Sequence, residues 1–364
     1  MRLSIARGEL LDSLNVVTKA LSSRTTLPIL SGILISAVGD SVILQSTDLE
    51  ISIKHTIGAG VEESGSVVMP GRLLAEVVRS LPEAAVHLET SSFDQVKVTC
   101  GTSSFVLRSL SPDDFPKFPE VSPGRKMVIP TATLTSLVRR VSRAVSRDEA
   151  RPILTGILMV IEGTVLRVVA TDSYRLAIAE AELPEPVEER IEVVVPGKAL
   201  EEIPKLAGGA ETVSMGIADN QIIFEFGSSV YVTRRIEGAF PNYRQLVPQD
   251  GETKVTVSRA DLEGAAKRVS LLAQHNAPLR VKVSDSTLTL SAQTQDVGEA
   301  SEDLMVATEG EPIEIAFNHA FLVDGLASSD EENLAFVASS PLKPGVFRST
   351  TGEGFTYLIM PVRP

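Results

Sequence analysis

The sequence predicts an α+β fold made of three tandem copies of one unit, with antiparallel strands and two helices in each copy. The main observation is an internal repeat, because Pro28–Leu34 (PILSGIL) recurs as Pro152–Leu158 (PILTGIL), 124 residues later. A Thr-Asp pair follows each segment at the same separation, as Thr47–Asp48 and Thr171–Asp172. A repeat in this order indicates a structural unit of roughly 120 residues and a function that uses repetition.

Two further matches keep nearly the same spacing, and a more divergent third copy follows them. Met69–Arg72 corresponds to Val195–Lys198, and Phe115–Pro116 corresponds to Phe240–Pro241. A chain of 364 residues is too long for one hydrophobic core, and about 150 residues per domain gives two or three domains. The repeat favours three domains, at residues 1–124, 125–250 and 251–364, with junctions in the proline-bearing stretches Phe118–Gly124 and Val247–Gly251.

Each copy is expected to open with a short strand that leads into a helix. Apolar residues at spacings of three and four predict one buried stripe along each of these helices. The stripes are Leu10, Leu14, Val17 and Leu21 in the first copy, Leu134, Leu137, Val138, Val141 and Val145 in the second, and Leu262, Ala266, Val269 and Leu272 in the third.

Short β-branched strands follow the first helix, and a second helix and two or three more strands complete the unit. This order predicts a sheet with its helices segregated on one face, and the short connections predict antiparallel pairing. In the first copy the strands are Ile33–Val38, Val42–Ser46 and Ile51–Ile57, and the second helices of the three copies are Gly71–Leu81, Gly197–Leu206 and Asn318–Leu326.

The composition is that of a soluble globular protein, with 43% hydrophobic and 22% charged residues. A single cysteine, Cys100, excludes an intramolecular disulfide and is interpreted as a small apolar strand residue. Met1–Glu9 lacks the apolar segment of a secretory signal, and no stretch is long and apolar enough to span a membrane. These features predict a cytoplasmic protein without a membrane partner.

The residue types that carry catalysis do not form a recognisable motif. His55, His87, His275 and His319 are scattered without metal-ligand spacing, and no phosphate-binding glycine loop or nucleophile elbow is present. The repeated aspartates Asp48 and Asp172 could serve acid–base chemistry, but a turn that bonds the backbone explains them better. We therefore expect a binding module without a cofactor or metal, and keep an enzyme that uses Asp48 or Asp172 as an alternative.

One predicted helix, Thr133–Arg147, carries basic residues that no acid interrupts. Arg139, Arg143 and Arg147 lie four residues apart, with Arg140 beside them, opposite the apolar stripe. A formal net charge of −13 argues against nucleic acid, but one basic surface can coexist with an acidic remainder. Without tryptophan, contact with the phosphate backbone is the expected mode. Further basic residues lie on or beside the corresponding helices: Arg24, Arg72, Lys198, Arg259, Lys267 and Arg268.

Five segments spread over the whole chain carry a family resemblance: Arg24–Leu30, Thr47–Glu50, Ala170–Ala177, Phe240–Tyr243 and Tyr357–Arg363. They resemble the bacterial replication sliding clamps, the beta subunits of DNA polymerase III. The resemblance implies a non-catalytic head-to-tail homodimer that closes into a ring, with sheets outside and helices lining a hole around duplex DNA. It also implies that the ring tethers the replicative polymerase, that a clamp loader opens it, and that other proteins with a clamp-binding motif share one pocket. A repeat-built scaffold that never encircles DNA is the alternative.

The resemblance also implies roles for particular residues. The family often has histidine at the position of Tyr174 and tyrosine at that of Phe321. For DNA the resemblance points to Arg24, Arg72, Arg147, Arg151 and Lys198, and the charge pattern adds Arg139 and Arg143. For the subunit joint it points to Phe105, Leu271, Leu272, Glu299, Glu302 and Asp303. The implied peptide-binding pocket between the second and third domains comprises Leu154, Thr171, Ser173, Tyr174, Arg175, Leu176, Pro241, Leu246, Asn318, Phe321, Leu342, Leu358, Met360, Pro361, Val362 and Arg363.

Overall fold

The computed structural model describes residues 1–22, 26–92, 94–120, 124–248, 251–273, 277–351 and 354–362. The chain forms two compact units that do not follow the repeat boundaries. The first unit contains residues 1–131 and 202–235, and the second contains residues 132–201 and 236–364. The second copy of the repeat therefore contributes to both units. Arg24, His275 and Arg363, as well as part of each predicted junction, lie outside the described residues.

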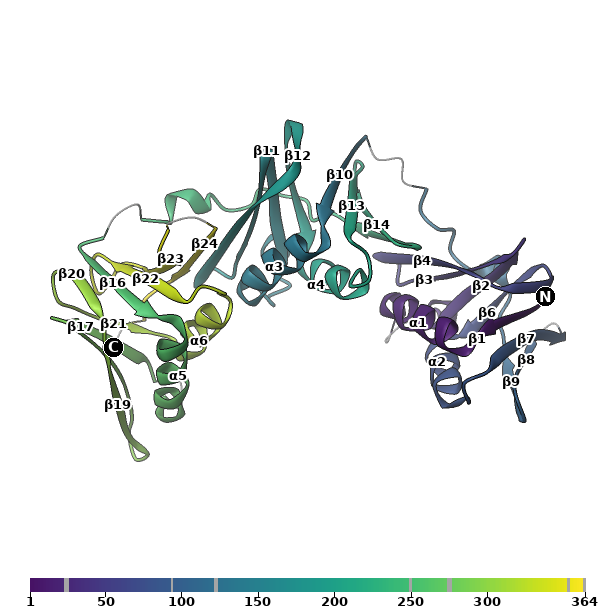
Figure 1. Ribbon diagram of the computed structural model, residues 1–364, viewed down its shortest axis with the longest axis horizontal. Helices are drawn as coiled ribbons and strands as arrows, with labels where there is room; N and C mark the ends of the chain where they lie inside the picture. Colours follow the sequence, from purple (N-terminus) through teal and green to yellow (C-terminus); the bar gives the residue numbers. More distant parts are fainter. Residues whose placement is uncertain are drawn as a thin grey trace. The chain divides into compact units, whose positions relative to one another are not determined.

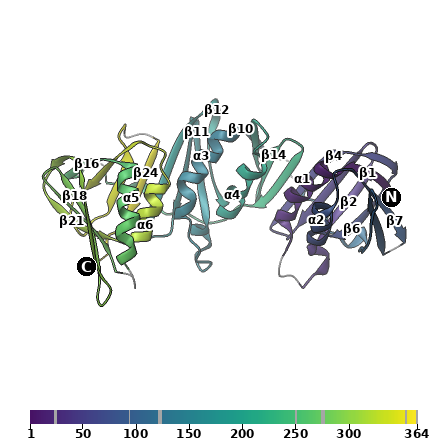
Figure 2. The ribbon, with the colours of Figure 1, turned by 60° about the horizontal axis from the view of Figure 1, so that its bottom comes forward.

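Each copy contains two α-helices in the described part of the chain, as the sequence predicts (Figure 1). A short 3₁₀ turn directly follows the first helix of every copy, at Thr18–Ala20, Ser142–Ala144 and Ser270–Leu272. The pairs α1 and α2, and α5 and α6, lie in contact and side by side (Figures 1 and 2). The helices are α1 (Arg7–Val17), α2 (Gly71–Ser80), α3 (Thr131–Val141), α4 (Gly197–Leu206), α5 (Arg259–Val269) and α6 (His319–Ala327).

The first unit contains two antiparallel sheets, with α1 packed against strands of both. The five-stranded sheet has the order β5 (Gly60–Glu63), β1 (Arg2–Ala6), β7 (Ala85–Ser92), β8 (Gln95–Cys100) and β9 (Ser103–Arg108). The eight-stranded sheet has the order β10 (Arg125–Pro130), β13 (Thr212–Ile217), β14 (Gln221–Phe226), β15 (Ser229–Arg234), β4 (Ile51–Gly58), β3 (Ser41–Thr47), β2 (Gly32–Val38) and β6 (Gly65–Pro70).

The second unit also contains two antiparallel sheets. The seven-stranded sheet has the order β11 (Gly156–Thr171), β12 (Arg175–Pro196), β24 (Phe355–Ile359), β23 (Gly345–Ser349), β22 (Asn333–Ala338), β16 (Thr253–Ser258) and β20 (Ala307–Gly310). The four-stranded sheet has the order β19 (Gly298–Met305), β18 (Thr287–Thr294), β17 (Leu279–Ser284) and β21 (Ile313–Phe317).

Successive copies are joined by the same strand pairing. β15 of the second copy pairs with β4 of the first, so that Tyr231 lies opposite Ile53. β24 of the third copy pairs with β12 of the second, so that Tyr357 lies opposite Ala177. Both pairings are antiparallel, and the tyrosine is buried in each. The repeat seen in the sequence is therefore also a repeat in the way one copy joins the next.

The repeated glycine of the PIL(S/T)G segment is needed for close packing. A Cβ atom on Gly32 would lie 2.4 Å from Cγ1 of Val68, and one on Gly156 would lie 2.4 Å from Cγ1 of Val194. Such contacts are far inside van der Waals distance, so only glycine lets these strands approach. The predicted stripes are confirmed within the helices, where Leu10, Leu14, Val17, Leu134, Leu137, Val138, Val141, Leu262, Ala266 and Val269 are buried. Beyond the helices Leu21 is buried, whereas Val145 and Leu272 are only half-buried.

The helix predicted over Thr133–Arg147 is shorter than the sequence pattern indicated. α3 ends at Val141, Arg143 lies in the 3₁₀ turn, and Arg147 lies beyond it. The backbone N–H of Ser146 donates a 3.0 Å hydrogen bond to the carbonyl of Leu154, which pulls the chain away from the helix axis. In the first copy the N–H of Ser22 makes the corresponding bond to the carbonyl of Leu30, at 3.2 Å. The repeated PIL(S/T)G segment therefore fixes the chain after the first helix in both copies. Within the described residues, no helix is long and apolar enough to cross a membrane.

Candidate functional site

The two Thr-Asp pairs form identical turns, as predicted. Oδ1 of Asp172 accepts hydrogen bonds from the backbone N–H groups of Tyr174 (2.9 Å) and Arg175 (3.0 Å). Oδ1 of Asp48 accepts from the backbone of Glu50 (3.0 Å) and Ile51 (2.7 Å). Each aspartate oxygen is therefore engaged by the backbone of its own turn, which is the behaviour of a turn residue.

Each turn places a residue other than glycine in the left-handed region. Leu49 has φ 78° and Ser173 has φ 80°. The threonine hydroxyl of each pair stabilises this conformation, because Thr47 Oγ1 accepts from Leu49 N–H (3.0 Å) and Thr171 Oγ1 accepts from Ser173 N–H (3.1 Å). The strained residue is therefore held from both sides by its own neighbours.

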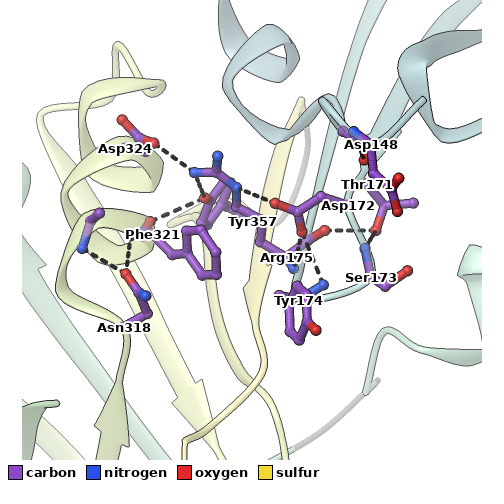
Figure 3. Close-up of polar contacts among 12 residues, drawn as sticks. Asp148, Thr171, Asp172, Ser173, Tyr174, Arg175, Asn318, Phe321, Asp324 and Tyr357 are labelled. Atoms are coloured by element: carbon purple, nitrogen blue, oxygen red, sulfur yellow. Dashed lines mark hydrogen bonds and ion pairs between the residues drawn. The ribbon is translucent and has the colours of Figure 1, made fainter. Parts of the chain in front are cut away.

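The second turn differs from the first because its last residue, Arg175, is the centre of a largely buried charged network (Figure 3). The guanidinium contacts Asp172 on one side (Nε to Oδ2, 3.0 Å) and Asp324 of α6 on the other (Nη1 to Oδ2, 2.6 Å). Its Cζ lies 4.4 Å from the centre of the Phe321 ring. The side chain of Arg175 is only 11% exposed, so these partners replace water. The network links the turn of the second copy to the second helix of the third.

The charges of this network fix its protonation state. Burial alone would lower the pKa of Arg175, but Tyr357, Asp324 and Asp172 reverse this effect and raise the pKa above its ordinary value. Burial raises the pKa of Tyr357, whose hydroxyl donates a 3.0 Å hydrogen bond to the carbonyl of Phe321. Arg175 therefore stays charged and Tyr357 stays neutral at physiological pH.

An aromatic pair lies beside this network, and the second unit carries further exposed apolar side chains. The Tyr174 ring is stacked on that of Phe321, with ring centres 6.3 Å apart and an interplanar angle of 26°. Tyr174 is 61% exposed although it is aromatic, and Leu246, Leu342 and Met360 are exposed as well. The segment directly after the last strand is tied to this region, because Met360 N–H donates to the carbonyl of Tyr174 (2.8 Å).

The remaining residues predicted for the pocket lie at different depths. Asn318 caps α6 by accepting from the N–H groups of Ala320 and Phe321. Val362 N–H donates to the carbonyl of Ala316. Ser173 and Pro241 are exposed, whereas Pro361 and Val362 are half-buried. Leu154, Thr171, Leu176 and Leu358 are buried, and Leu176 and Leu358 belong to a core cluster of the second unit.

Three arginines near the end of α3 form ion pairs with acids, which the uninterrupted basic pattern in the sequence did not indicate. Arg139 pairs with Asp330, Arg140 lies 3.7 Å from the same carboxylate, and Arg143 pairs with Asp324 at 3.0 Å. These acids come from the third copy, so a pattern confined to one helix could not reveal them. Arg151 pairs with Asp148 and donates to Ser173.

Other basic residues remain available to a ligand. Three exposed cations make no ion pair with another described residue. They are Arg72 on α2, Lys198 on α4, and Arg147 in the segment after α3. In the third copy Arg259 and Lys267 both pair with Glu263, and Arg268 pairs with Glu302.

The residues implied for a subunit joint lie on two edge strands and a turn. Phe105 lies on β9 and is half-buried, whereas Glu299, Glu302 and Asp303 lie on β19. Glu302 bonds Arg268 of its own chain, and Asp303 accepts from Thr289 Oγ1 at 2.6 Å. Leu271, in the 3₁₀ turn after α5, is 70% exposed, and Leu272 beside it is half-buried.

Residues of the types that bind metals do not cluster in the described part of the chain. No group of three His, Cys, Asp or Glu residues there could hold a metal ion. His55 Nδ1 lies 2.7 Å from Ser229 Oγ, and burial lowers the pKa of His55. Cys100 is buried on β8, as expected for a small apolar strand residue.

Asp324, Asp330 and Tyr357 were not identified from the sequence. Asp324 and Asp330 are at least 149 residues from the arginines they contact. Tyr357 could have been noticed, because Tyr231 occupies the corresponding strand position one copy earlier. The geometry thus defines a protein of three tandem α+β copies, with a buried charged network where the second and third copies pair.

Comparison with known proteins identifies the family that has this architecture. The chain matches the models of the DNA polymerase III beta subunit N-terminal, central and C-terminal domains over residues 1–119, 128–242 and 244–363. The beta sliding clamp of Staphylococcus epidermidis is 34% identical to this chain, and the match covers 100% of this chain and 99% of that protein. The crystal structure of the DNA polymerase sliding clamp from Bacillus subtilis has a TM-score of 0.96 and 31% identity, covering 100% of this chain and 99% of that one. A Pseudomonas aeruginosa sliding clamp bound to griselimycin has a TM-score of 0.94 and 28% identity, with full coverage of both chains.

The chain belongs to the DNA polymerase III beta subunit family, the bacterial sliding clamps. Members of this family are non-catalytic processivity factors of DNA replication. The prediction of three tandem α+β clamp domains is confirmed.

The two matched turns allow the contribution of the Arg175 ion pair to be isolated. Asp172→Asn keeps an oxygen for the backbone hydrogen bonds but removes the charge that contacts Arg175. We expect the variant to lose about 1–3 kcal/mol of the free energy of unfolding, because a charged hydrogen bond to a buried group is lost. Thermal and urea-induced unfolding measure this loss.

Asp48→Asn is the matched control, because the same turn there ends in the uncharged Ile51 in place of Arg175. This variant should stay within about 0.5 kcal/mol of the parent chain. Equal losses in the two variants would show that the contact with Arg175 contributes nothing.

Proposed function

We propose that two copies of this chain join head to tail into a closed ring around duplex DNA and tether the replicative polymerase to it. The observation that carries this proposal is the repeated joint between copies. The last strand of one copy pairs with the hairpin strand of the copy before it, as β15 with β4 and β24 with β12. The strands that would continue this series are β9 of the first copy and β19 of the third, and both are sheet edges. We place the domains at residues 1–124, 125–250 and 251–364.

An unpaired strand edge favours pairing with another chain. β9 (Ser103–Arg108) corresponds to β15 and β24, which begin 126 and 252 residues later. β9 of a second molecule can therefore pair with β19 of the first in the antiparallel arrangement of the internal joints. Two such heterologous contacts close a ring when the rotation per subunit is half a turn. Phe105, Leu271, Leu272, Glu299, Glu302 and Asp303 would then lie at the joint.

The proposed DNA contact is electrostatic and independent of base sequence. Of the cations expected to contact DNA, Arg72, Arg147 and Lys198 are exposed and make no ion pair with another described residue, so they are available to phosphate. Arg139, Arg143 and Arg151 take part less, because each is bonded to an acid of its own chain. Arg24 remains in the proposed set on the family resemblance alone.

The proposed partner site is the surface around Tyr174, Phe321, Leu342, Met360 and Leu246. An exposed apolar cluster beside a rigid charged network suits an apolar peptide anchor. The buried residues beneath it, such as Leu176 and Leu358, support the surface rather than contact the peptide. We propose that the replicative polymerase, the clamp loader and other proteins with a clamp-binding motif use this site, in the cytoplasm where the chromosome is replicated.

The ring is tested by comparing circular with linear DNA. Protein loaded onto a nicked circle by its clamp loader should remain bound during gel filtration at moderate salt, and should be lost once a restriction enzyme linearises the circle. The protein alone should have twice the 38.9 kDa mass of the chain in native mass measurements. Equal loss from both forms of DNA would favour a scaffold that never encircles the duplex.

The salt dependence of DNA binding tests which cations contact phosphate and which are held by carboxylates of their own chain. The double variant Arg72→Ala with Lys198→Ala should bind linear duplex more weakly. The slope of log affinity against log salt should fall by about 2, since each lost phosphate contact removes about 0.9. Fluorescence anisotropy between 50 and 200 mM salt, as approximate limits, measures the slope. Arg139→Ala serves as the control and should leave the slope nearly unchanged; a fall of similar size there would contradict the assignment.

The partner surface is tested with a peptide that carries the clamp-binding motif of the polymerase. Tyr174→Ala removes an exposed aromatic side chain from the proposed contact. We expect the peptide to bind about 10-fold more weakly or worse, as measured by calorimetry, because aromatic anchors dominate such interfaces. Leu49→Ala alters an exposed apolar residue of the equivalent turn in the first copy and should have no effect. Unchanged binding by Tyr174→Ala would remove this surface from the proposal.

A further inference from the structure

Two joints between copies share an ion pair in addition to their strand pairing. In the first unit Nζ of Lys19 lies 3.1 Å from the carboxylate of Glu202. In the second unit Nη1 of Arg143 lies 3.0 Å from the carboxylate of Asp324. In both cases a cation of one copy contacts an acid of the next copy.

The four residues occupy equivalent positions in the repeat. Lys19 and Arg143 are the middle residues of the 3₁₀ turns Thr18–Ala20 and Ser142–Ala144, each of which directly follows an 11-residue helix. Glu202 and Asp324 are both the sixth residue of the second helix of their copy, in α4 and α6. The ion pair is therefore a property of the joint, repeated with the fold.

The equivalent positions also exist in the third copy, for the turn, and in the first copy, for the second helix. The middle residue of the 3₁₀ turn Ser270–Leu272 is Leu271, and the sixth residue of α2 is Glu76. Glu76 keeps the acid, is exposed and makes no ion pair with another described residue. Leu271 replaces the cation with an aliphatic side chain that is 70% exposed. The third joint would thus have the acid but not its partner.

We propose that Leu271 faces Glu76 of the partner subunit at the joint between molecules, at the place where both internal joints hold an ion pair. The proposal rests on the head-to-tail ring proposed above. The joint between molecules would then present an aliphatic side chain to an exposed carboxylate, where Lys19 contacts Glu202 and Arg143 contacts Asp324 in the internal joints.

A lysine at position 271 should supply the missing interaction. Leu271→Lys also removes apolar surface, so its net effect on the joint combines a gain and a loss. The informative quantity is therefore the dependence of this effect on Glu76. A pair of exposed charges changes an equilibrium by up to about fivefold.

The experiment measures subunit exchange between differently labelled dimers. Leu271→Lys should exchange up to about fivefold more slowly with Glu76 present than in the Glu76→Gln background. The difference should disappear at about 1 M salt, where exposed charges are screened. Leu271→Lys combined with Asp12→Asn is the control, because Asp12 is an exposed acid on α1 of the same copy. An effect of lysine that is independent of residue 76, or a monomer in both backgrounds, would overturn the proposal.

Cross-linking tests the contact without relying on its energy. The double variant Leu271→Cys with Glu76→Cys should give a covalent dimer with a short bis-maleimide, whereas each single variant should not. Cys100 is buried and leaves little background. A native dimer that does not cross-link would overturn this inference alone, whereas a monomeric parent chain would overturn the proposed ring.

Discussion

The structure depends above all on the need to satisfy the backbone hydrogen bonds of strand edges. β4 and β12 each have a partner in their own copy on one side only, and the next copy supplies the other. A buried strand edge left unpaired would lose several backbone hydrogen bonds, so the pairing of β15 with β4 and of β24 with β12 is obligatory. The resulting sheets of eight and seven strands explain why the compact units do not coincide with the repeats.

The Thr-Asp turn lies at the start of each of these pairing strands, which explains why it recurs. It reverses the chain from β3 into β4 and from β11 into β12, while its carboxylate bonds the backbone of the turn. In the first copy the turn ends in Ile51, which carries no charge. In the second copy it ends in Arg175, and this one difference converts a structural turn into the centre of a charged network.

The sequence was sufficient for features that depend on local periodicity. The positions of the second helices, the buried stripes and the Thr-Asp turns follow from spacing and side-chain chemistry, and the structure confirms them. The end of α3 was misjudged because a hydrogen bond from Ser146 to the distant segment Pro152–Thr155 decides it. The apolar spacing typical of a helix continues through Val145, but the helix itself ends at Val141.

The charge on the arginines could not be interpreted from the sequence for a related reason. Asp324 and Asp330 belong to another copy, and only strand pairing brings them to Arg143 and Arg139. The exposure of Tyr174 and Met360 likewise depends on what the neighbouring copy leaves uncovered. Residues whose role depends on contacts between copies were identified by family resemblance or were missed.

The pairing of these arginines alters the account of how an acidic protein would hold DNA. If every cation of the second copy contacted phosphate, the accumulated counterion release would make binding strong and movement along the duplex slow. Carboxylates of the third copy instead neutralise Arg139 and Arg143, which leaves Arg147 and Lys198 in this copy, with Arg72 in the first, without an ion pair among the described residues. A few such cations on a chain of net charge −13 give weak attraction that is easily renewed at the next phosphate. Retention on DNA would then come from closure of the ring rather than from affinity, and this places the mechanical demand on the joint between subunits.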